Sequence, residues 1–146
     1  MPVLTLEERF SRALHNTARV WRVALDARLK NLGVSQAGWM TIAMIAKAQV
    51  PPSQSELAAE LSIEPASMVA MIDRLVKAGF VERVASETDR RIKHIRLTRA
   101  GEGIYAEVRA KATEFREDIL KHVAPDELAV MTNTLERIQT LIETSS

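Results

Sequence analysis

Basic side chains concentrate in one short segment near the middle of the chain, and their chemistry suits a polyanion. Between residues 82 and 99 there are six Arg or Lys and three Asp or Glu, whereas residues 101–146 carry five and nine, and the whole chain has a formal net charge of +1. A local patch of guanidinium and ammonium groups attracts phosphates whatever the overall charge is. The distribution therefore predicts a nucleic-acid contact. The six basic residues are Arg83, Arg90, Arg91, Lys93, Arg96 and Arg99.

Residues suited to other chemistry are scattered or absent from the sequence. The three histidines, His15, His94 and His122, lie far apart, and no pair of carboxylates stands near a predicted cleft. The five glycines form no phosphate-binding loop and no nucleophile elbow, and the absence of cysteine leaves no thiolate, disulfide or zinc finger. We therefore expect no catalytic site, no metal and no cofactor.

The composition predicts a mostly helical chain that works inside the cell. With 146 residues, 47% of them hydrophobic and 27% charged, the chain has the size of a single domain, residues 1–146. Few aromatic residues and many Ala, Leu, Ile, Met and Glu favour helices. No apolar run approaches the roughly 20 residues that span a bilayer, and the N-terminus lacks the pattern of a secretory signal. Together with the missing cysteines, these features predict a cytoplasmic location.

The basic segment follows two short helices joined by a tight turn. Ser53 is a candidate N-cap with Glu56 three residues later, which is the capping-box spacing. Pro65 suits the first turn of the next helix, where its missing N–H has no intrahelical partner, and Gly79 suits the left-handed residue that ends it. A further helix begins earlier, at its N-cap Ser35. This order predicts a helix-turn-helix, a common scaffold that is moderately specific for DNA.

The basic segment itself predicts a β-hairpin. Residues 80–84 and 92–97 alternate apolar and polar side chains at period two, and the polar residues 85–91 between them form the tip. A hairpin directly after a helix-turn-helix is a wing. Residues 35–98 are therefore expected to form a winged helix-turn-helix lobe that binds DNA, with its wing at residues 80–98.

Long amphipathic helices flank this lobe. Thr5 and Glu8 form a capping box ahead of apolar positions that repeat at helical spacing, and residues 99–145 predict two more helices with a break before Pro125. A short domain cannot bury all these apolar stripes alone. We therefore expect residues 5–30 and 99–145 to pack against a second copy of the chain in a homodimer. The predicted fold class is mainly α with a small β-hairpin, a winged helix-turn-helix flanked by N- and C-terminal dimerisation helices.

These segments resemble the MarR family of winged-helix transcriptional regulators. The wing carries the specific match, Asp89-Arg90-Arg91 followed by Ile95 and by Leu97-Thr98. Residues 63–69 and 73–81 are similar to that family's recognition helix and first wing strand. Within the family, the chain is similar to the SlyA-type subgroup at Arg19-Val20-Trp21-Arg22, Asp26-Ala27-Arg28-Leu29 and Trp39. The resemblance covers almost the whole chain.

The resemblance implies an assembly as well as a fold. The first, fifth and sixth helices of two subunits would interlock in a homodimer. Each subunit would then present one winged helix-turn-helix to half of a pseudo-palindromic operator in double-stranded DNA.

The expected DNA contacts divide between base edges and phosphates. Side chains in the first two turns of the second helix of such a motif usually reach base edges in the major groove, and here they are Pro65, Ala66, Ser67, Ala70 and Met71. Ser67 can donate or accept a hydrogen bond, whereas Ala66 and Met71 offer apolar contacts, for instance to thymine methyls. The SlyA-type pattern typically has an arginine that reads guanine where this chain has Ala70. A bidentate Arg–guanine pair is worth about 1–3 kcal/mol, so its absence predicts weaker or different base selectivity.

The wing and the start of the preceding helix are expected to contact the rest of the DNA. Arg90 or Arg91 at the tip of a thin hairpin can enter the minor groove, and Asp89 would hold one of them in register through a charge-assisted hydrogen bond. Arg74 could contact a phosphate or form a surface ion pair. Exposed N–H groups at the start of a helix suit phosphates, and the candidates there are Ser53, Gln54 and Ser55.

A ligand site is implied by the family resemblance. In the family, small aromatic carboxylates lodge between the dimer helices and the DNA-binding lobe, and the matching positions here are Arg19, Arg22 and Trp39. A guanidinium can bind a carboxylate while an indole offers an apolar face. Two structural alternatives stay open, namely that Trp39 belongs to the core and that Arg22 pairs with Asp26 one turn away.

Two alternatives to DNA binding by the wing also stay open. Charged hairpin tips are often merely solvated, and some winged helices bind proteins without touching DNA. A wing that binds a protein partner need not be basic, whereas this one is. The pattern therefore favours a homodimeric, sequence-specific DNA-binding transcriptional regulator whose response to small aromatic acids is open to test.

Overall fold

The structure is a computed structural model that describes residues 2–145. The chain divides into two compact units, Met1–Lys111 and Ala112–Ser146. The boundary between the units falls inside a helix, Arg99–Leu120. The winged helix-turn-helix predicted at residues 35–98 lies wholly in the first unit.

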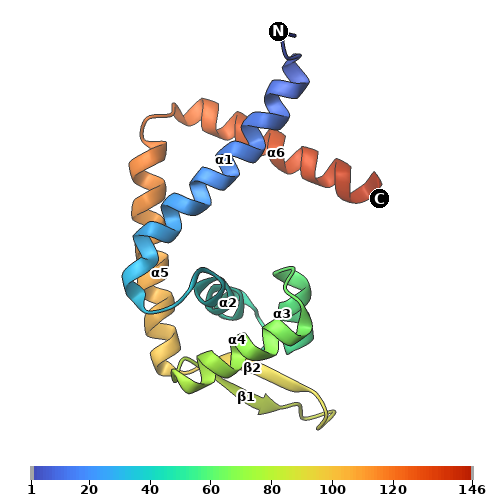
Figure 1. Cartoon of the computed structure of the whole chain (residues 1–146), viewed down its shortest axis with the longest axis vertical. Coiled ribbons are helices and arrows are strands. Elements are labelled where there is room, and N and C mark those ends of the chain that lie inside the picture. Colours follow the sequence, from blue (N-terminus) through green and yellow to red (C-terminus); the bar gives the residue numbers. More distant parts are fainter. Residues whose placement is uncertain (1, 146) are drawn as a thin grey trace. The chain divides into compact units, whose positions relative to one another are not determined.

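Within residues 2–145 the elements are six α-helices, one short 3-10 helix and two antiparallel strands, which confirms the predicted fold class (Figure 1). In chain order they are α1 (Leu6–Leu29), η1 (Lys30–Leu32), α2 (Gln36–Lys47), α3 (Gln54–Glu60), α4 (Pro65–Lys77), β1 (Val81–Ala85), β2 (Lys93–Leu97), α5 (Arg99–Leu120) and α6 (Pro125–Ser145).

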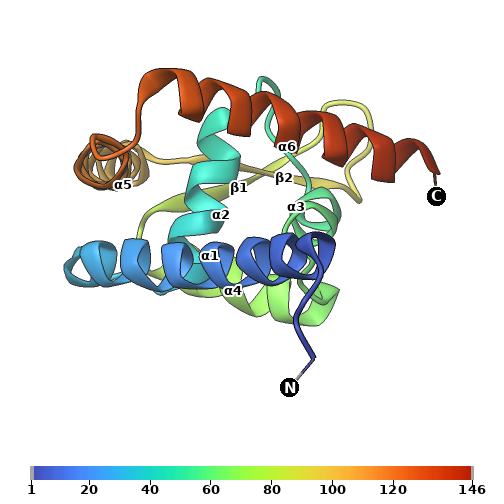
Figure 2. The same cartoon turned by 90° about the horizontal axis from the view of Figure 1, so that it is seen from above.

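The helix starts are set by side-chain caps that the sequence predicted. Thr5 and Glu8 form the capping box of α1, with the Glu8 backbone N–H donating to Thr5 Oγ1 at 3.2 Å and the Thr5 N–H donating to Glu8 Oε2 at 2.7 Å. Ser35 caps α2 by accepting from the Gly38 N–H at 3.1 Å. These bonds satisfy N–H groups that the helices leave without intrahelical partners. They fix where α1 and α2 begin, and α1 then runs as one uninterrupted helix (Figure 2).

The hairpin pairs β1 with β2 in antiparallel register, with Val81 opposite Leu97 and Ala85 opposite Lys93. Its strands begin one residue later than the sequence predicted. A contact that the sequence did not reveal extends this sheet, because the Ile95 N–H donates to the Pro52 carbonyl oxygen at 2.8 Å. The segment before α3 thus lies along the outer edge of β2, which ties the helix-turn-helix to the wing.

One hydrophobic core holds the lobe together. Fully buried side chains from α2, α3, α4 and the hairpin meet in it, among them Ile42, Leu57, Met68, Ile72 and Ile95. Each such side chain contributes about 1.5–3 kcal/mol by leaving water. The core therefore sits behind α4 and fixes which face of that helix is left for a ligand.

A second, smaller cluster anchors the end of α1 to the lobe. Leu29 from α1, Trp39 from α2 and Val108 from α5 are buried together, with Leu25 and Met40 packed against them. The cluster joins the consecutive helices α1 and α2 to the distant helix α5. The C-terminal end of α1 is therefore fixed by packing, whereas its N-terminal half lacks buried residues.

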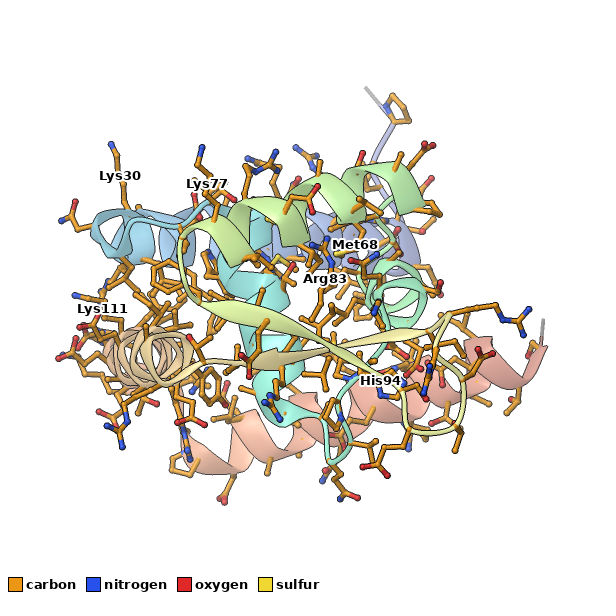
Figure 3. All side chains as sticks on the ribbon, turned by 90° about the horizontal axis from the view of Figure 1, so that it is seen from below. Lys30, Met68, Lys77, Arg83, His94 and Lys111 are labelled. Carbon is orange, nitrogen blue, oxygen red and sulfur yellow. The ribbon has the colours of Figure 1, made fainter. Side chains whose placement is uncertain are left out.

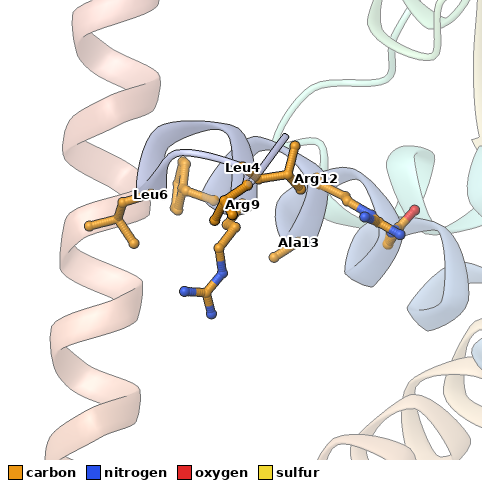
Figure 4. Close-up of a pocket in the computed structure, with 8 residues that line it drawn as sticks. Leu4, Leu6, Arg9, Arg12 and Ala13 are labelled. Carbon is orange, nitrogen blue, oxygen red and sulfur yellow. The ribbon is translucent and has the colours of Figure 1, made fainter. Parts of the chain in front are cut away.

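Large apolar side chains on α1 and α6 stay open to solvent in the single chain, among them Leu6, Phe10, Val23, Leu141 and Ile142. Figure 4 shows a hollow at the N-terminal end of α1, where Leu4 and Leu6 lie near Arg9. Every residue that lines the hollow belongs to residues 3–16, so the hollow follows one helix and is not enclosed by other elements. No helix among the described residues combines the length and apolar character needed to cross a membrane.

Candidate nucleic-acid interface

Helix α4 turns small, uncharged side chains to solvent over its first turns. Pro65 occupies the first helical position, and Ala66, Ser67 and Ala70 are exposed. Such a face can approach base edges closely, because it carries no long side chain that would hold the helix away from the groove floor. Four of the predicted base-edge residues are thus exposed to solvent in the first two turns of α4.

The structure corrects the expectation for Met71, the fifth residue expected to reach base edges. It is 6% exposed and packs in the core of the lobe with Met68 and Ile72. Met71 follows Met68 by three residues and precedes Leu75 by four, which places it on the buried stripe of the helix. Its side chain is therefore not available to thymine methyls, and the expectation for Met71 was wrong.

Two exposed residues on α4 were missed in the sequence. Val69, which is 42% exposed, and Asp73 follow Ala66 by three and seven residues, so they share its side of the helix. Helical spacing counted outward from the buried Met68 would have found them. Val69 adds an apolar contact to this face, and Asp73 places a carboxylate in the middle of it.

Positive charge lies toward the C-terminal end of α4. Arg74 is exposed, and among residues 2–145 no acidic side chain comes within ion-pair distance of it. Lys77 projects from the last turn away from the hairpin (Figure 3). Of the two roles left open for Arg74, the surface ion pair is not formed among the described residues, and the phosphate contact stays a prediction.

The start of α3 is already hydrogen-bonded within the protein. Ser53 Oγ accepts from the Glu56 N–H at 3.1 Å and donates to Glu56 Oε1 at 3.2 Å, so both functions of the hydroxyl are in use. Gln54 accepts through Oε1 from Arg83, which leaves its side-chain N–H groups as donors. Ser55 is exposed. The capping role predicted for Ser53 is confirmed, while the phosphate contacts predicted for these three residues stay predictions.

Arg83 joins three elements of the lobe and was not singled out in the sequence. Its Nε donates to Gln54 Oε1 on α3 at 2.8 Å, and its Nη2 donates to Asp73 Oδ1 on α4 at 2.6 Å. Figure 3 shows Arg83 between α4 and the hairpin. Period two along β1 places Arg83 on the same side as the buried Val81, which is the signal that could have found it.

The wing tip is organised around Ser86 and Asp89. Ser86 Oγ accepts from the backbone N–H groups of Thr88 and Asp89, both at 3.3 Å. Asp89 then holds Arg91: Oδ1 accepts from the Arg91 backbone N–H at 3.0 Å and from its Nε at 3.2 Å, and Oδ2 accepts from Nη2 at 3.2 Å. The predicted contact between Asp89 and a neighbouring arginine is thus present, and the arginine is Arg91.

The same contacts set the charge state of the tip. The Arg91 side chain, and then the Arg91 backbone N–H, lower the pKa of Asp89 below its ordinary value of 3.8, which outweighs the small opposing effect of burial. Asp89 is therefore an anion at neutral pH, paired with an arginine whose side chain is 89% exposed. The pairing orients Arg91 without burying it.

Ion pairs also determine which of the six basic residues between positions 82 and 99 carry uncompensated charge. Arg83 pairs with Asp73, Arg91 with Asp89, and Arg96 with Glu82 on the opposite strand. Within residues 2–145 no acidic partner lies within ion-pair distance of the other three. Those three are Arg90, Lys93 and Arg99, all of them exposed.

The residues expected at a ligand site meet in part. Trp39 is 7% exposed, and its indole N–H donates to Asp26 Oδ1 at 3.2 Å. Arg22 lies over the Trp39 ring, with Cζ 5.8 Å from the ring centroid, and its Nη1 lies 3.1 Å from Met40 Sδ. Trp39 is thus a core residue, one of the alternatives left open, and Asp26 pairs with Trp39. Arg19 is exposed one turn before Arg22.

The chain resembles known regulators in sequence and structure. Residues 35–93 match the model of the MarR family. The crystal structure of the transcriptional regulator PA3341 superposes with a TM-score of 0.83 at 36% identity, covering 92% of this chain and 98% of that one. FabT of Streptococcus pneumoniae, solved in complex with DNA, gives 0.81 at 25% identity over 96% and 99%. A MarR mutant of E. coli complexed with operator DNA gives 0.76 at 24% over 89% and 93%, a likeness of fold.

Proposed function

The chain belongs to the MarR family, and we propose that it is a homodimeric DNA-binding regulator of transcription that acts in the cytoplasm. The observation that carries the proposal is the pairing of two surfaces in one lobe, the small exposed face of α4 and a wing whose tip holds Arg91 in place. The structure of FabT with DNA supports this role for a lobe of the same build. We assign the chain no catalytic activity.

The α4 face and the wing contact different grooves of the duplex. Helix α4 enters the major groove, where Ala66, Val69 and Ala70 offer methyl groups to thymine and Ser67 offers a hydrogen bond. The wing follows the backbone to the minor groove, where Arg91 reads groove width and potential. Because α4 lacks a long basic side chain in its first turns, base selectivity rests on shape and apolar contacts there.

A dimer is required both to cover the exposed apolar faces of α1 and α6 and to recognise an operator with two half-sites. The exposed apolar side chains of α1 and α6 form patches that a monomer would leave in water. A two-fold dimer that covers them presents two α4 helices, and the half-sites of such a dimer lie about 34–36 Å apart on the duplex. We therefore propose a pseudo-palindromic site with two half-sites about one helical turn apart.

Binding to genomic DNA tests the proposal directly. Fragments of the source genome captured by the purified protein supply candidate sites, and fluorescence anisotropy then gives affinity as a function of salt. We expect saturable binding of two chains per site, with log K falling linearly with log salt by about 0.9 for each phosphate neutralised. No saturable binding at low salt to any captured fragment would refute DNA binding.

We further propose that a small aromatic acid regulates DNA binding by forming an ion pair with the Arg22 guanidinium. The present partners of that guanidinium are a thioether and an indole ring, and a carboxylate would bind it more strongly than either. Such a ligand changes DNA affinity only if it prefers one arrangement of the dimer to another. Titration of the DNA complex with salicylate should weaken binding of wild type and of Arg12→Ala, an exposed control on the same helix, but not of Arg22→Ala. An equal response of the three proteins would exclude Arg22 as the site.

A further inference from the structure

The contacts of Arg83 set it apart from the other arginines of the hairpin. Arg91 and Arg96 each pair with an acid of the hairpin itself, whereas Arg83 reaches Gln54, 29 residues before it, and Asp73, ten residues before it. A single guanidinium therefore links the start of α3, the middle of α4 and strand β1. These are the three elements whose mutual placement decides how the lobe meets a duplex.

Asp73 occupies a position where a carboxylate needs an explanation. It lies on the same side of α4 as Ala66 and Ala70, and its side chain is 60% exposed. If that side enters the major groove, a free carboxylate there would be carried between two rows of phosphates and would oppose binding. Arg83 Nη2 lies 2.6 Å from Asp73 Oδ1, so the guanidinium neutralises the carboxylate locally.

Arg83 itself is held more firmly than a surface arginine. Its side chain is 29% exposed, and its register partner on β2 is the fully buried Ile95, so the side chain leaves β1 on the core-facing side. The planar guanidinium donates in two directions from one rigid group, which fixes the spacing between Gln54 and Asp73. A lysine ammonium is a point charge on a flexible stem and cannot reproduce that geometry.

We propose that Arg83 is a positioning residue for DNA recognition, which holds α3, α4 and β1 in one register and neutralises Asp73 on the DNA-facing side of α4. The inference rests on the proposed DNA binding. Arg83 acts through the placement and charge of Asp73 and Gln54. Its loss therefore alters two separable quantities, the affinity for DNA and the dependence of that affinity on salt.

Four variants separate the two effects. Arg83→Ala should bind the selected site about tenfold more weakly, with a salt slope shallower by about one, because one positive charge is gone and a lone carboxylate is left at the interface. Asp73→Asn should bind at least as tightly as wild type, with a slope steeper by about one. The double variant Arg83→Ala with Asp73→Asn should recover several-fold of the loss, because the lone carboxylate is removed. Arg83→Lys should lie between wild type and Arg83→Ala.

Arg96→Ala is the matched control. Arg96 also pairs with an acid, Glu82, and it lies on the opposite face of the same hairpin, so the variant breaks an equivalent ion pair away from α4. We expect it to bind within about threefold of wild type. Circular dichroism and thermal unfolding of each variant show whether the lobe is folded. Should Arg83→Ala not fold, Arg83→Lys and Asp73→Asn still decide.

The outcomes distinguish this inference from the function on which it rests. Wild-type protein that binds no captured DNA would overturn the proposed function, and the role of Arg83 with it. Wild-type binding with Arg83→Ala equal to Arg96→Ala, or Arg83→Lys equal to wild type, would overturn the positioning role alone. A double variant as weak as Arg83→Ala, or an Asp73→Asn variant that binds more weakly or prefers another base, would overturn the neutralising role.

Discussion

The DNA-binding lobe and the flanking helices differ in how completely a single chain buries their apolar residues. In the lobe, Leu57, Met68 and Ile72 are fully buried among side chains of the same chain. On α6, by contrast, Leu141 is 58% exposed, although it repeats at the same helical spacing as residues that are buried elsewhere. The same amphipathic pattern therefore has two outcomes here. It closes a core where four elements of the lobe converge, and on α6 it leaves apolar side chains exposed, which fits the proposed contact with a second chain.

Introducing a charge on the open face tests this difference most severely. Leu141→Glu should weaken dimerisation by about 100-fold or more, because a lone carboxylate buried in an apolar interface costs several kcal/mol. Sedimentation equilibrium measures the dimer dissociation constant. Asn133→Glu, which adds the same charge at an exposed polar position of α6, is the control and should leave dimerisation unchanged. A Leu141→Glu variant as dimeric as the control would show that this face is not the interface.

Two glycines of α5 sharpen the contrast at the point where the lobe adjoins a flanking helix. A Cβ at Gly101 would lie 2.0 Å from the Phe80 carbonyl oxygen, whereas a Cβ at Gly103 would meet nothing within 4 Å. Gly101→Ala should therefore lower the free energy of unfolding by about 1–3 kcal/mol, since the obstacle is backbone and cannot rotate away. Gly103→Ala should raise it by up to about 1 kcal/mol through helix propensity. Urea unfolding of the two variants side by side checks both signs, and equal values would contradict the close approach of α5 to Phe80.

The wing offers a smaller effect, which concerns binding and leaves the fold intact. Arg90→Ala and Arg91→Ala should each weaken DNA binding by about tenfold, and each should make the salt slope shallower by about one. At low salt, Arg91→Ala should lose more DNA affinity than Arg90→Ala. Asp89 already holds the Arg91 side chain in place, so less conformational entropy is lost when Arg91 binds DNA. Anisotropy titrations across salt concentrations measure both quantities. Affinity that is unchanged in both variants would remove the wing from the interface.

The elements of both regions could be predicted because their signals are local. The caps at Thr5, Ser35 and Ser53, the proline that starts α4 and the glycine that ends it each act within a few residues, and the structure has them where the sequence placed them. The alternation that predicts the hairpin is local as well. Its strand ends moved by one residue, since the cross-strand register, which the sequence does not state, decides where pairing begins.

What escaped prediction depends on contacts between distant residues. Arg83 was counted as one of six basic residues between positions 82 and 99, and its role appears only when the fold brings Gln54 and Asp73 to it. Met71 was misplaced because a list of early helix residues ignores which of them face the core. The DNA contacts predicted for the remaining candidates depend on atoms of the duplex as well as on the sequence and fold of this chain.

The smallest predicted effect concerns the titration of Asp89 at the edge of the lobe. Arg91 lowers the pKa of Asp89 below 3.8, so the favourable interaction is present at all pH values above that range and is lost as the pH falls through the lowered pKa. DNA affinity should therefore show no dependence on Asp89 between about pH 5 and 8. An NMR titration of the Asp89 carboxyl should give a midpoint below 3.8 in the wild type that returns toward 3.8 in Arg91→Ala. The same midpoint in both proteins would mean that Arg91 is not held by Asp89 in solution, and the advantage predicted for Arg91 over Arg90 would disappear with it.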